Sequence, residues 1–260
     1  MFDLLPNQWT PALPLTEFEW QPMPVEVAGE ELVLFRDADE VACALIDRCP
    51  HRGAALSLGQ VTDAGELQCG YHGWCFRGDG SCARVPLNKP GKRALAKIKA
   101  TAVPTRELAG AVWVFTGAKP RGEPMLPESL QGPAEEYGTY SQDWDAHWTR
   151  AIENFIDFAH PPYLHRETIG AYSHEFAESG GIARVELEET AFGFTTMNYF
   201  GGRSFGFQLD WYAPNLSRLH FGPGHELHVF SIPLDAERTR VMTVRRLPPG
   251  ADPARYAKRA

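Results

Sequence analysis

Two short segments, each with one cysteine and one histidine, constrain this chain more than any other feature. They are Cys49-Pro-His51-Arg-Gly53 and Cys69-Gly-Tyr-His72-Gly-Trp74. A set of two thiolates and two imidazoles suits either a tetrahedral structural zinc or a [2Fe–2S] cluster with cysteines on one iron and histidines on the other. A zinc finger pairs its cysteines in one loop and its histidines on a following helix. Here each loop offers one of each, which favours a two-iron cluster between facing loops, with zinc as the alternative.

Charge and composition exclude several classes of partner. The 260 residues carry a net charge of −8, whereas nucleic-acid binders show a basic stripe. Residues 1–9 lack a basic targeting region, and no apolar run approaches the roughly eighteen residues of a membrane span. We therefore expect a soluble, cytoplasmic protein with no nucleic-acid or membrane partner.

The remaining cysteines do not suggest disulfides. The chain has five cysteines, and two of them are assigned to the paired loops. A disulfide framework is typical of secreted chains, and no secretory signal is present. Cys43, Cys75 and Cys82 are therefore expected to be small buried packing residues.

The first half of the chain shows the period of β-strands. Short alternating runs at 31–35, 41–46, 66–69 and 111–115 are separated by turn residues such as those at 77–81. A proline- and glycine-rich segment at 119–136 then resembles a linker. We expect an all-β domain over residues 1–118, with the paired loops at its tip, and a second domain over residues 119–260.

Residues 147–160 show the period of a helix with one apolar face. The opposite face gathers ionisable and amide groups at spacings of three or four: Arg150, Glu153, Asn154, Asp157 and His160. Pro161 and Pro162 are expected to end or kink this helix, and His165 follows one turn later. Two imidazoles near a carboxylate suit the facial triad that binds non-haem Fe(II). His160 and His165 are thus candidate iron ligands, and a solvated helix face is the alternative.

Residues beyond 180 again alternate like strands. Runs at 182–188, 192–200, 205–212, 227–232 and 239–245 predict an antiparallel meander. A curved sheet of this kind around the helix would form an apolar pocket. Candidates to line it, for which a plain core role is the alternative, are Phe200, Phe207, Trp211, Phe221 and Phe230. Candidates to meet a substrate carboxylate, for which surface solvation is the alternative, are Arg203, Asn215 and Arg218.

Taken together, the motifs resemble those of the Rieske non-haem iron oxygenases. The C-x-H-R-G and C-x-x-H-G-W loops match the cluster motif, and Glu153-Asn154-x-x-Asp157-x-x-His160-x-x-x-x-His165 matches the mononuclear-iron motif. The resemblance implies an α+β chain with an amino-terminal all-β Rieske domain and a carboxy-terminal helix-grip catalytic domain. The chain is most similar to aromatic monooxygenases and O-demethylases of the dicamba monooxygenase and vanillate O-demethylase type.

The resemblance also implies cofactors, partners and a reaction. Cys49, His51, Cys69 and His72 would hold the [2Fe–2S] cluster, and His160 and His165 a mononuclear Fe(II). Electrons from NADH would arrive through a separate ferredoxin or flavin reductase, since the chain has no dinucleotide-binding glycine motif. A homotrimer is implied, in which Asp157 bridges His72 of one chain and His160 of the next. Dioxygen would then hydroxylate or O-demethylate an aromatic substrate, in the catabolism of aromatic acids.

The third iron ligand departs from the family pattern. Family members supply an aspartate well downstream of the second histidine, but only 95 residues follow His165. We expect the catalytic domain to be incomplete at its carboxy terminus; Asp210, Asp235 and Asp252 are the acidic candidates otherwise. The gap leaves an alternative open, a Rieske electron-transfer or redox-sensing protein whose second domain binds a ligand without oxidising it.

Overall fold

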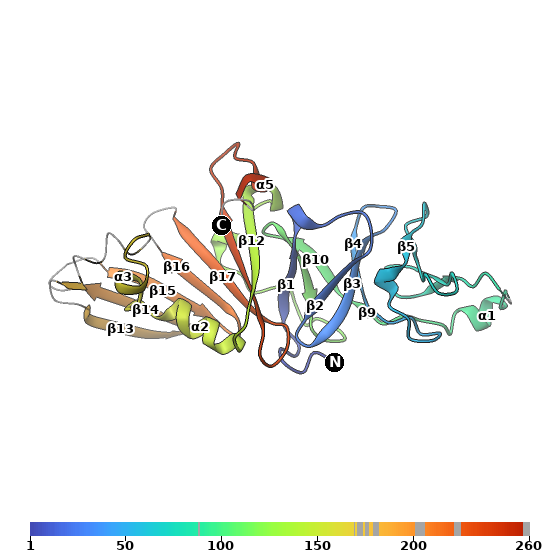
Figure 1. The fold of residues 1–260 in the computed structure, drawn as a ribbon, viewed down its shortest axis with the longest axis horizontal. Coiled ribbons are helices and arrows are strands. Elements are labelled where there is room, and N and C mark those ends of the chain that lie inside the picture. The colour runs from blue at the N-terminus through green and yellow to red at the C-terminus, as the bar shows by residue number, and fades with distance from the viewer. Residues whose placement is uncertain are drawn as a thin grey trace. The chain divides into compact units, whose positions relative to one another are not determined.

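A computed structural model describes residues 1–87, 89–168, 170, 174, 177–178, 182–200, 206–220 and 225–256 (Figure 1). The chain forms two compact units. The first comprises Met1–Ser141 with the later segments Pro233–Ala236 and from Leu247 onward, and the second comprises Gln142–Ile232 with Glu237–Arg246. No helix within the described ranges is long and apolar enough to cross a membrane.

The first unit is built from three small antiparallel sheets. Their strand orders are β1-β11-β10, β2-β3-β4-β9 and β5-β6-β7-β8. The strands are β1 (Trp9–Pro14), β2 (Met23–Val27), β3 (Glu30–Arg36), β4 (Ala42–Ile46), β5 (Gln60–Val61), β6 (Leu67–Gln68), β7 (Cys75–Phe76), β8 (Cys82–Arg84), β9 (Ala102–Val103), β10 (Thr105–Leu108) and β11 (Ala111–Phe115). One short helix, α1 (Lys92–Leu95), follows β8. The predicted strand-rich first half is confirmed.

A single apolar core supports the paired loops of this unit. Val33 and Phe35 from β3, Leu67 from β6 and Phe76 from β7 are fully buried in it. The side chains of Cys49 and Cys69 belong to the same core. Because the loops spring from these packed strands, burial of the apolar side chains also fixes the positions of the two thiols.

The second unit is organised by a seven-stranded sheet of order β12-β18-β17-β16-β15-β14-β13. The strands are β12 (Tyr137–Trp144), β13 (Ile182–Thr190), β14 (Gly193–Phe200), β15 (Gly206–Tyr212), β16 (Leu216–His220), β17 (Glu226–Pro233) and β18 (Thr239–Arg246). Consecutive strands from β13 to β17 pair antiparallel. The expected meander is confirmed.

Helix α2 (Trp148–Ile156) packs its apolar face on this sheet (Figure 1). Ala151 is buried against Val229 of β17 and Val241 of β18. The ring of Phe155 stacks on Trp144 with centroids 5.6 Å apart. A helix of this length is marginal alone in water, so the packed apolar face stabilises it.

The predicted helix through residue 160 is too long. Asp157 leaves helical geometry at φ −85° and ψ 114°. Its Oδ1 accepts a hydrogen bond from the amide of Ala159 at 2.8 Å, a local turn that competes with a further helical turn. Pro161 then begins the one-turn helix α3 (Pro161–Leu164), because proline fits the first helical position. The prolines therefore start a helix here and do not end one.

Candidate cluster and iron sites

The two cysteine–histidine loops have the same backbone geometry. In each, the cysteine amide donates to the carbonyl five residues later at 2.8 Å, and the glycine amide four residues later donates to the cysteine carbonyl at 2.8 or 2.9 Å. Those glycines, Gly53 and Gly73, have φ of +74° and +68°, where a side chain would be strained. The glycine spacing thus folds both loops into matching cradles around Cys49 and Cys69.

Across the two loops, the two cysteines lie next to each other, and so do the two histidines. Burial, together with contact with the Cys69 thiol, raises the pKa of Cys49 to about 11. The imidazole rings of His51 and His72 lie with centroids 4.8 Å apart. Desolvation and the nearby His72 lower the pKa of His51, which favours the neutral imidazole that a metal requires. Two sulfurs on one side and two imidazoles on the other fit a [2Fe–2S] cluster of the mixed type.

The zinc alternative fits this arrangement less well. A tetrahedral zinc needs all four ligands around one ion. Within the described ranges, no three or more His, Cys, Asp and Glu side chains lie close enough to share a single ion. The geometry favours a core with separate positions for the thiolate pair and the imidazole pair.

Aromatic contacts hold the two imidazoles. The ring of Trp74, from the second loop, stacks on His51 of the first loop with centroids 4.3 Å apart and planes 5° apart. Tyr71 lies against His72 at 3.9 Å between centroids. Sequence reasoning placed Trp74 in the motif but missed this role, which depends on the spatial meeting of the two loops. Stacking across the loops restricts rotation of His51 before any metal binds.

Cys69→Ser is expected to impair cluster retention, because a hydroxyl is a poor substitute for a soft thiolate at iron. The visible absorption and acid-labile sulfide of the purified protein would then fall to a small fraction of the wild-type values. Cys82→Ser is the matched control, since Cys82 is equally a buried free thiol of this unit but its thiol lies 3.6 Å from the carbonyl of Arg84, outside the two loops. Equal loss in both variants would show that general destabilisation, not ligation, is responsible.

The second candidate site lies where α2 gives way to α3. His160 occupies the position before α3 and His165 the position after it, so one helical turn separates them. Their ring centroids are 5.5 Å apart. Nδ1 of His160 lies 3.2 Å from Oδ2 of Asp157, which orients the ring and leaves Nε2 for a metal. The structure thus brings together all three residues that the sequence singled out.

The described residues do not complete a three-ligand iron site. No third carboxylate or imidazole joins His160 and His165 closely enough to share one ion within those residues. Asp210 is fully buried in an ion pair with Arg218, Asp235 lies in the turn between β17 and β18, and Asp252 accepts from the amide of Ala254 at the start of α5 (Pro253–Tyr256). The donor set here fits two of the three ligands of a facial triad.

The predicted pocket residues lie in different surroundings. Phe207 stacks on Phe158, two residues before His160, with centroids 4.5 Å apart, whereas Phe230 is a buried core residue. Trp211 donates its indole N–H to the carbonyl of Pro214 at 3.1 Å. Phe221 and the side chain of Phe200 lie outside the described residues, as does Arg203, which was predicted to meet a substrate carboxylate.

Arg218 is not a solvated surface residue. Its guanidinium is largely buried and lies 2.5 Å from Oδ2 of Asp210. Asn215 is also buried. Alternation along a strand did not reveal the ion pair, because it depends on the register that places Asp210 opposite Arg218 on the neighbouring strand.

The fold and the two donor sets together define an iron–sulfur protein joined to an oxygenase-type domain. Residues 8–105 match the Rieske [2Fe-2S] domain, and residues 144–244 match the vanillate O-demethylase oxygenase C-terminal domain. The chain thus carries a Rieske-type domain followed by a domain similar to the carboxy-terminal part of vanillate O-demethylase oxygenases, and the predicted α+β class is confirmed.

Curated relatives and solved structures agree with this assignment. The chain is 36% identical to the 3-chlorobenzoate-3,4-dioxygenase oxygenase subunit of Comamonas testosteroni, over 64% of this chain and 39% of that protein. It is 36% identical to a Pseudomonas vanillate O-demethylase oxygenase subunit, over 62% of this chain and 47% of the relative. It therefore spans less than half of these relatives.

Two solved structures show the same fold at low identity. Dicamba monooxygenase bound to dicamba superposes with a TM-score of 0.69 at 21% identity, covering 92% of this chain and 76% of that one. The oxygenase of carbazole 1,9a-dioxygenase, solved in a complex with ferredoxin, gives a TM-score of 0.71 at 19% identity, covering 97% and 75%.

Proposed function

We propose that the chain is the oxygenase component of a multicomponent system that hydroxylates or O-demethylates an aromatic acid. It would use dioxygen and NADH electrons delivered in the cytoplasm by a separate ferredoxin or flavin reductase. The observation that carries this proposal is the presence in one chain of the paired loops and of the His160–His165 pair with its aspartate. The names of the two relatives described above, both oxygenase subunits, support it.

Each donor set has its own role in this proposal. Within residues 1–118, Cys49 and Cys69 would hold one iron of the cluster, and His51 and His72 the other. Within residues 119–260, His160 and His165 would hold Fe(II) with a carboxylate from outside the described residues. When bound, the cluster supplies single electrons, and the Fe(II) provides open positions for dioxygen beside the substrate.

Asp157 would be a positioning residue at the junction of the two centres. Its carboxylate holds the ring of His160 but is still 49% exposed, so it has room to accept a second hydrogen bond. In a homotrimer, His72 of a neighbouring copy would be the second donor. A shared acceptor orients both imidazoles and shortens the path for electrons.

The side chains near His160 suit an aromatic substrate. Phe158, two residues before the histidine, and Phe207 form a stacked pair of rings. Such a surface excludes water and offers ring faces for offset stacking. The acidic group of the substrate has no assigned partner among these residues.

One observation favours a second function. The described residues supply two imidazoles and no third ligand. A chain that never gains a third ligand would act as a Rieske electron carrier or redox sensor, with the second unit binding an apolar ligand unchanged.

Metal content and turnover separate the two functions. The oxygenase requires about three irons per chain, two of them with acid-labile sulfide, and NADH oxidation that depends on reductase, dioxygen and aromatic acid. The carrier requires about two irons per chain, with reversible reduction of the cluster and no substrate oxidation. The latter result would overturn the oxygenase proposal.

A further inference from the structure

A buried side-chain amide lies on the apolar face of the sheet in the second unit. Leu219 of β16 packs beside Ala151 of α2 and pairs with Leu209 of β15, so both leucines lie on the face that α2 covers. Phe207 is two residues before Leu209 on the same strand and therefore shares this face. Asn198 of β14 lies directly opposite Phe207, which places its amide on the same face. Asn198 is only 5% exposed.

Two hydrogen bonds fix the direction of this amide. Its Nδ2 donates to Oγ1 of Thr196 at 3.1 Å and to the carbonyl oxygen of Phe207 at 3.3 Å. Because a backbone carbonyl can only accept, the nitrogen of Asn198 must face these partners and the oxygen must face the other way. Both amide hydrogens are thus used, whereas Oδ1 accepts no hydrogen bond within the part of the chain that the structure describes. A buried oxygen without a donor costs free energy that a bound donor would recover.

The surroundings of Asn198 are aromatic on one side and incompletely covered on the other. The ring of Phe207 stacks on Phe158 with centroids 4.5 Å apart, and Phe158 is two residues before His160. Val185 of β13 lies opposite Asn198 on the other flank and is 54% exposed. An aromatic molecule that lies against the two rings would therefore bring its ring substituents toward the amide.

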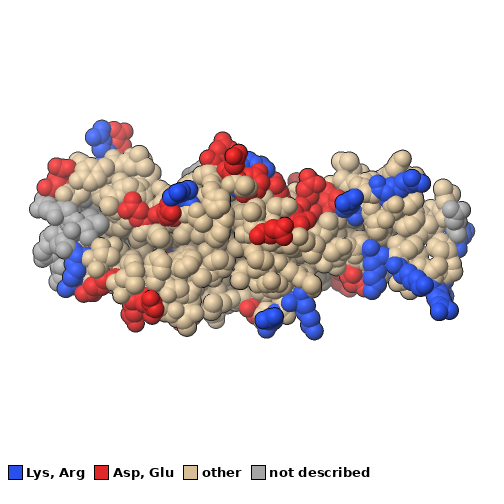
Figure 2. Space-filling view, turned by 90° about the horizontal axis from the view of Figure 1, so that it is seen from below, with Lys and Arg blue, Asp and Glu red and all other residues tan. Residues whose placement is uncertain are grey.

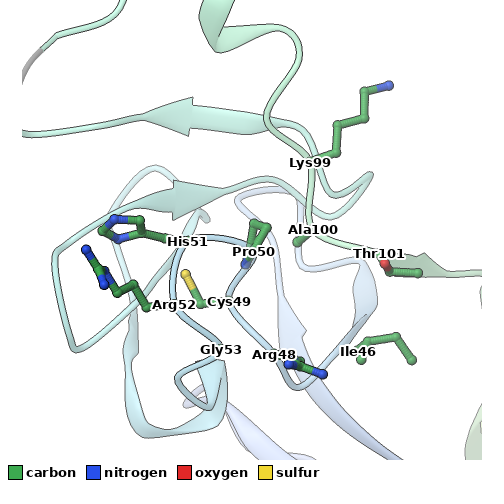
Figure 3. Close-up of a pocket in the computed structure, with 10 residues that line it drawn as sticks. All are labelled: Ile46, Arg48, Cys49, Pro50, His51, Arg52, Gly53, Lys99, Ala100 and Thr101. Carbon is green, nitrogen blue, oxygen red and sulfur yellow. The ribbon is translucent and has the colours of Figure 1, made fainter.

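The cations that suit an acid group are concentrated in the other unit. Figure 2 shows Lys and Arg gathered over the part of the first unit that carries α1 and the paired loops. A hollow of about 440 Å³ beside Cys49 is lined there by Arg48, Arg52 and Lys99 (Figure 3). This hollow belongs to the cluster site. Asn198 has the opposite chemistry, because its unpaired atom is an acceptor and calls for a donor.

We propose that Oδ1 of Asn198 accepts a hydrogen bond from a hydroxyl or amino group on the ring of the aromatic substrate. The inference rests on the proposed function and narrows its substrate class from aromatic acids to aromatic acids that carry a ring donor. The acid group itself is not the partner, since an ionised carboxylate offers acceptors only. A ring with a methyl group in place of the donor leaves Oδ1 unpaired, so the site discriminates against it.

The first test uses the unmodified protein. Isothermal titration calorimetry on the cluster-loaded full chain compares meta- and para-hydroxybenzoate and the two corresponding aminobenzoates with the corresponding methylbenzoates. Each pair shares the acid group and differs in one substituent of similar size. At least one hydroxy- or aminobenzoate is expected to bind roughly tenfold more tightly than its methyl analogue, and the two series show which donor is preferred. Equal affinities throughout both series would overturn the proposal.

The variant Asn198→Leu tests whether this amide is the source of the preference. Leucine has nearly the same shape but neither donates nor accepts, so the affinity for the preferred ligand should fall about tenfold while the methyl analogue binds as before. Asn198→Ala replaces it if leucine prevents folding. An equal loss of affinity for donor and methyl ligands would indicate a purely structural role and would also overturn the proposal.

Ser217→Ala is the matched control. Ser217 is buried, its hydroxyl has no hydrogen-bond partner within the described residues, and it lies on the same face of the sheet. It pairs with Trp211, however, four residues along β15 from Phe207. The preference for a ring donor should stay within about twofold of the unmodified protein. Loss of the preference in Ser217→Ala, with Asn198→Leu unaffected, would place the recognition elsewhere and contradict the role of Asn198.

Turnover separates this inference from the proposed function. Reductase-driven oxidation of benzoates without a ring donor, together with equal affinities across the series, would leave the oxygenase standing and remove the role of Asn198. Donor-selective binding that depends on Asn198, without oxidation of any ligand, would do the reverse.

Discussion

Asp157→Asn is expected to lower reductase-driven substrate oxidation by roughly 100-fold while both metal sites stay loaded. The amide has the size of the carboxylate, so the local turn at Ala159 and the fold should persist. It lacks the negative charge that favours a proton on Nδ1 of His160, 3.2 Å away, and that would accept a second imidazole. The measurements are NADH oxidation with excess reductase, iron content and the visible spectrum.

The decisive readout for Asp157 is the rate at which the reduced cluster is reoxidised in the presence of substrate and dioxygen. A positioning role between two centres slows this step but leaves reduction of the cluster by the donor unchanged. Asp145→Asn is the control, an exposed aspartate three residues before α2. Near-normal reoxidation in Asp157→Asn would contradict the bridge, and loss of iron would instead make Asp157 essential for metal retention.

The chemistry of the paired loops could be predicted from sequence because it is local. The spacing of cysteine, histidine and glycine within six residues sets both the ligand types and the backbone turn, and the structure repeats that turn in both loops. Packing across loops is not local. The stacking of Trp74 on His51 joins residues that only the folded core brings together.

Periodicity was less informative where polar side chains interact with the backbone. The helical pattern continues to residue 160, yet α2 ends at Ile156, because the carboxylate of Asp157 binds the amide of Ala159. Such side-chain turns compete with helical hydrogen bonds and leave no mark on apolar spacing. Their consequence is functional, since the same carboxylate reaches His160 through its other oxygen.

Surface solvation was the alternative interpretation of Arg218, and its ion pair with the buried Asp210 shows that this alternative is wrong. Asp210 on β15 lies opposite Arg218 on β16, and Arg218 lies opposite His228 on β17. Only this register shows that Asp210, Arg218 and His228 lie on the same face of the sheet, where their side chains shield one another from water. An isolated sequence offers the alternation of each strand but not the pairing of charges across strands.

Asp210→Ala is expected to destabilise the second unit by about 3–5 kcal/mol. The carboxylate is fully buried and accepts hydrogen bonds from Thr195 at 2.7 Å, Gln208 at 2.9 Å and Arg218 at 2.6 Å, with His220 Nε2 at 3.0 Å. Its removal leaves a largely buried guanidinium without its counter-ion. Chemical denaturation followed by circular dichroism measures the loss.

The stability of the protein at low pH should also depend on the carboxylate of Asp210. Burial alone would raise the pKa of Asp210, but hydrogen bonds from His220, Gln208 and Thr195, with the charge of Arg218, hold that pKa well below its usual range. Because the pKa of this carboxyl is lower in the folded protein than in the unfolded chain, where it is about 3.9, the charged carboxylate stabilises the fold at pH values above about 3.9. This stabilisation is lost as the pH falls from about 3.9 toward the pKa of the folded protein. Wild-type protein should therefore lose stability below about pH 4 more steeply than Asp210→Ala.

A second aspartate–arginine pair of the same unit provides the control. Asp143 Oδ1 lies 2.8 Å from Nε of Arg240, but its carboxylate is 44% exposed. Water screens that pair, so Asp143→Ala should cost no more than about 1 kcal/mol. Equal costs at Asp143 and Asp210 would mean that burial does not set the strength of these pairs. A large difference would identify the Asp210 network as the electrostatic support of the sheet on which α2 and, through it, the two histidines are placed.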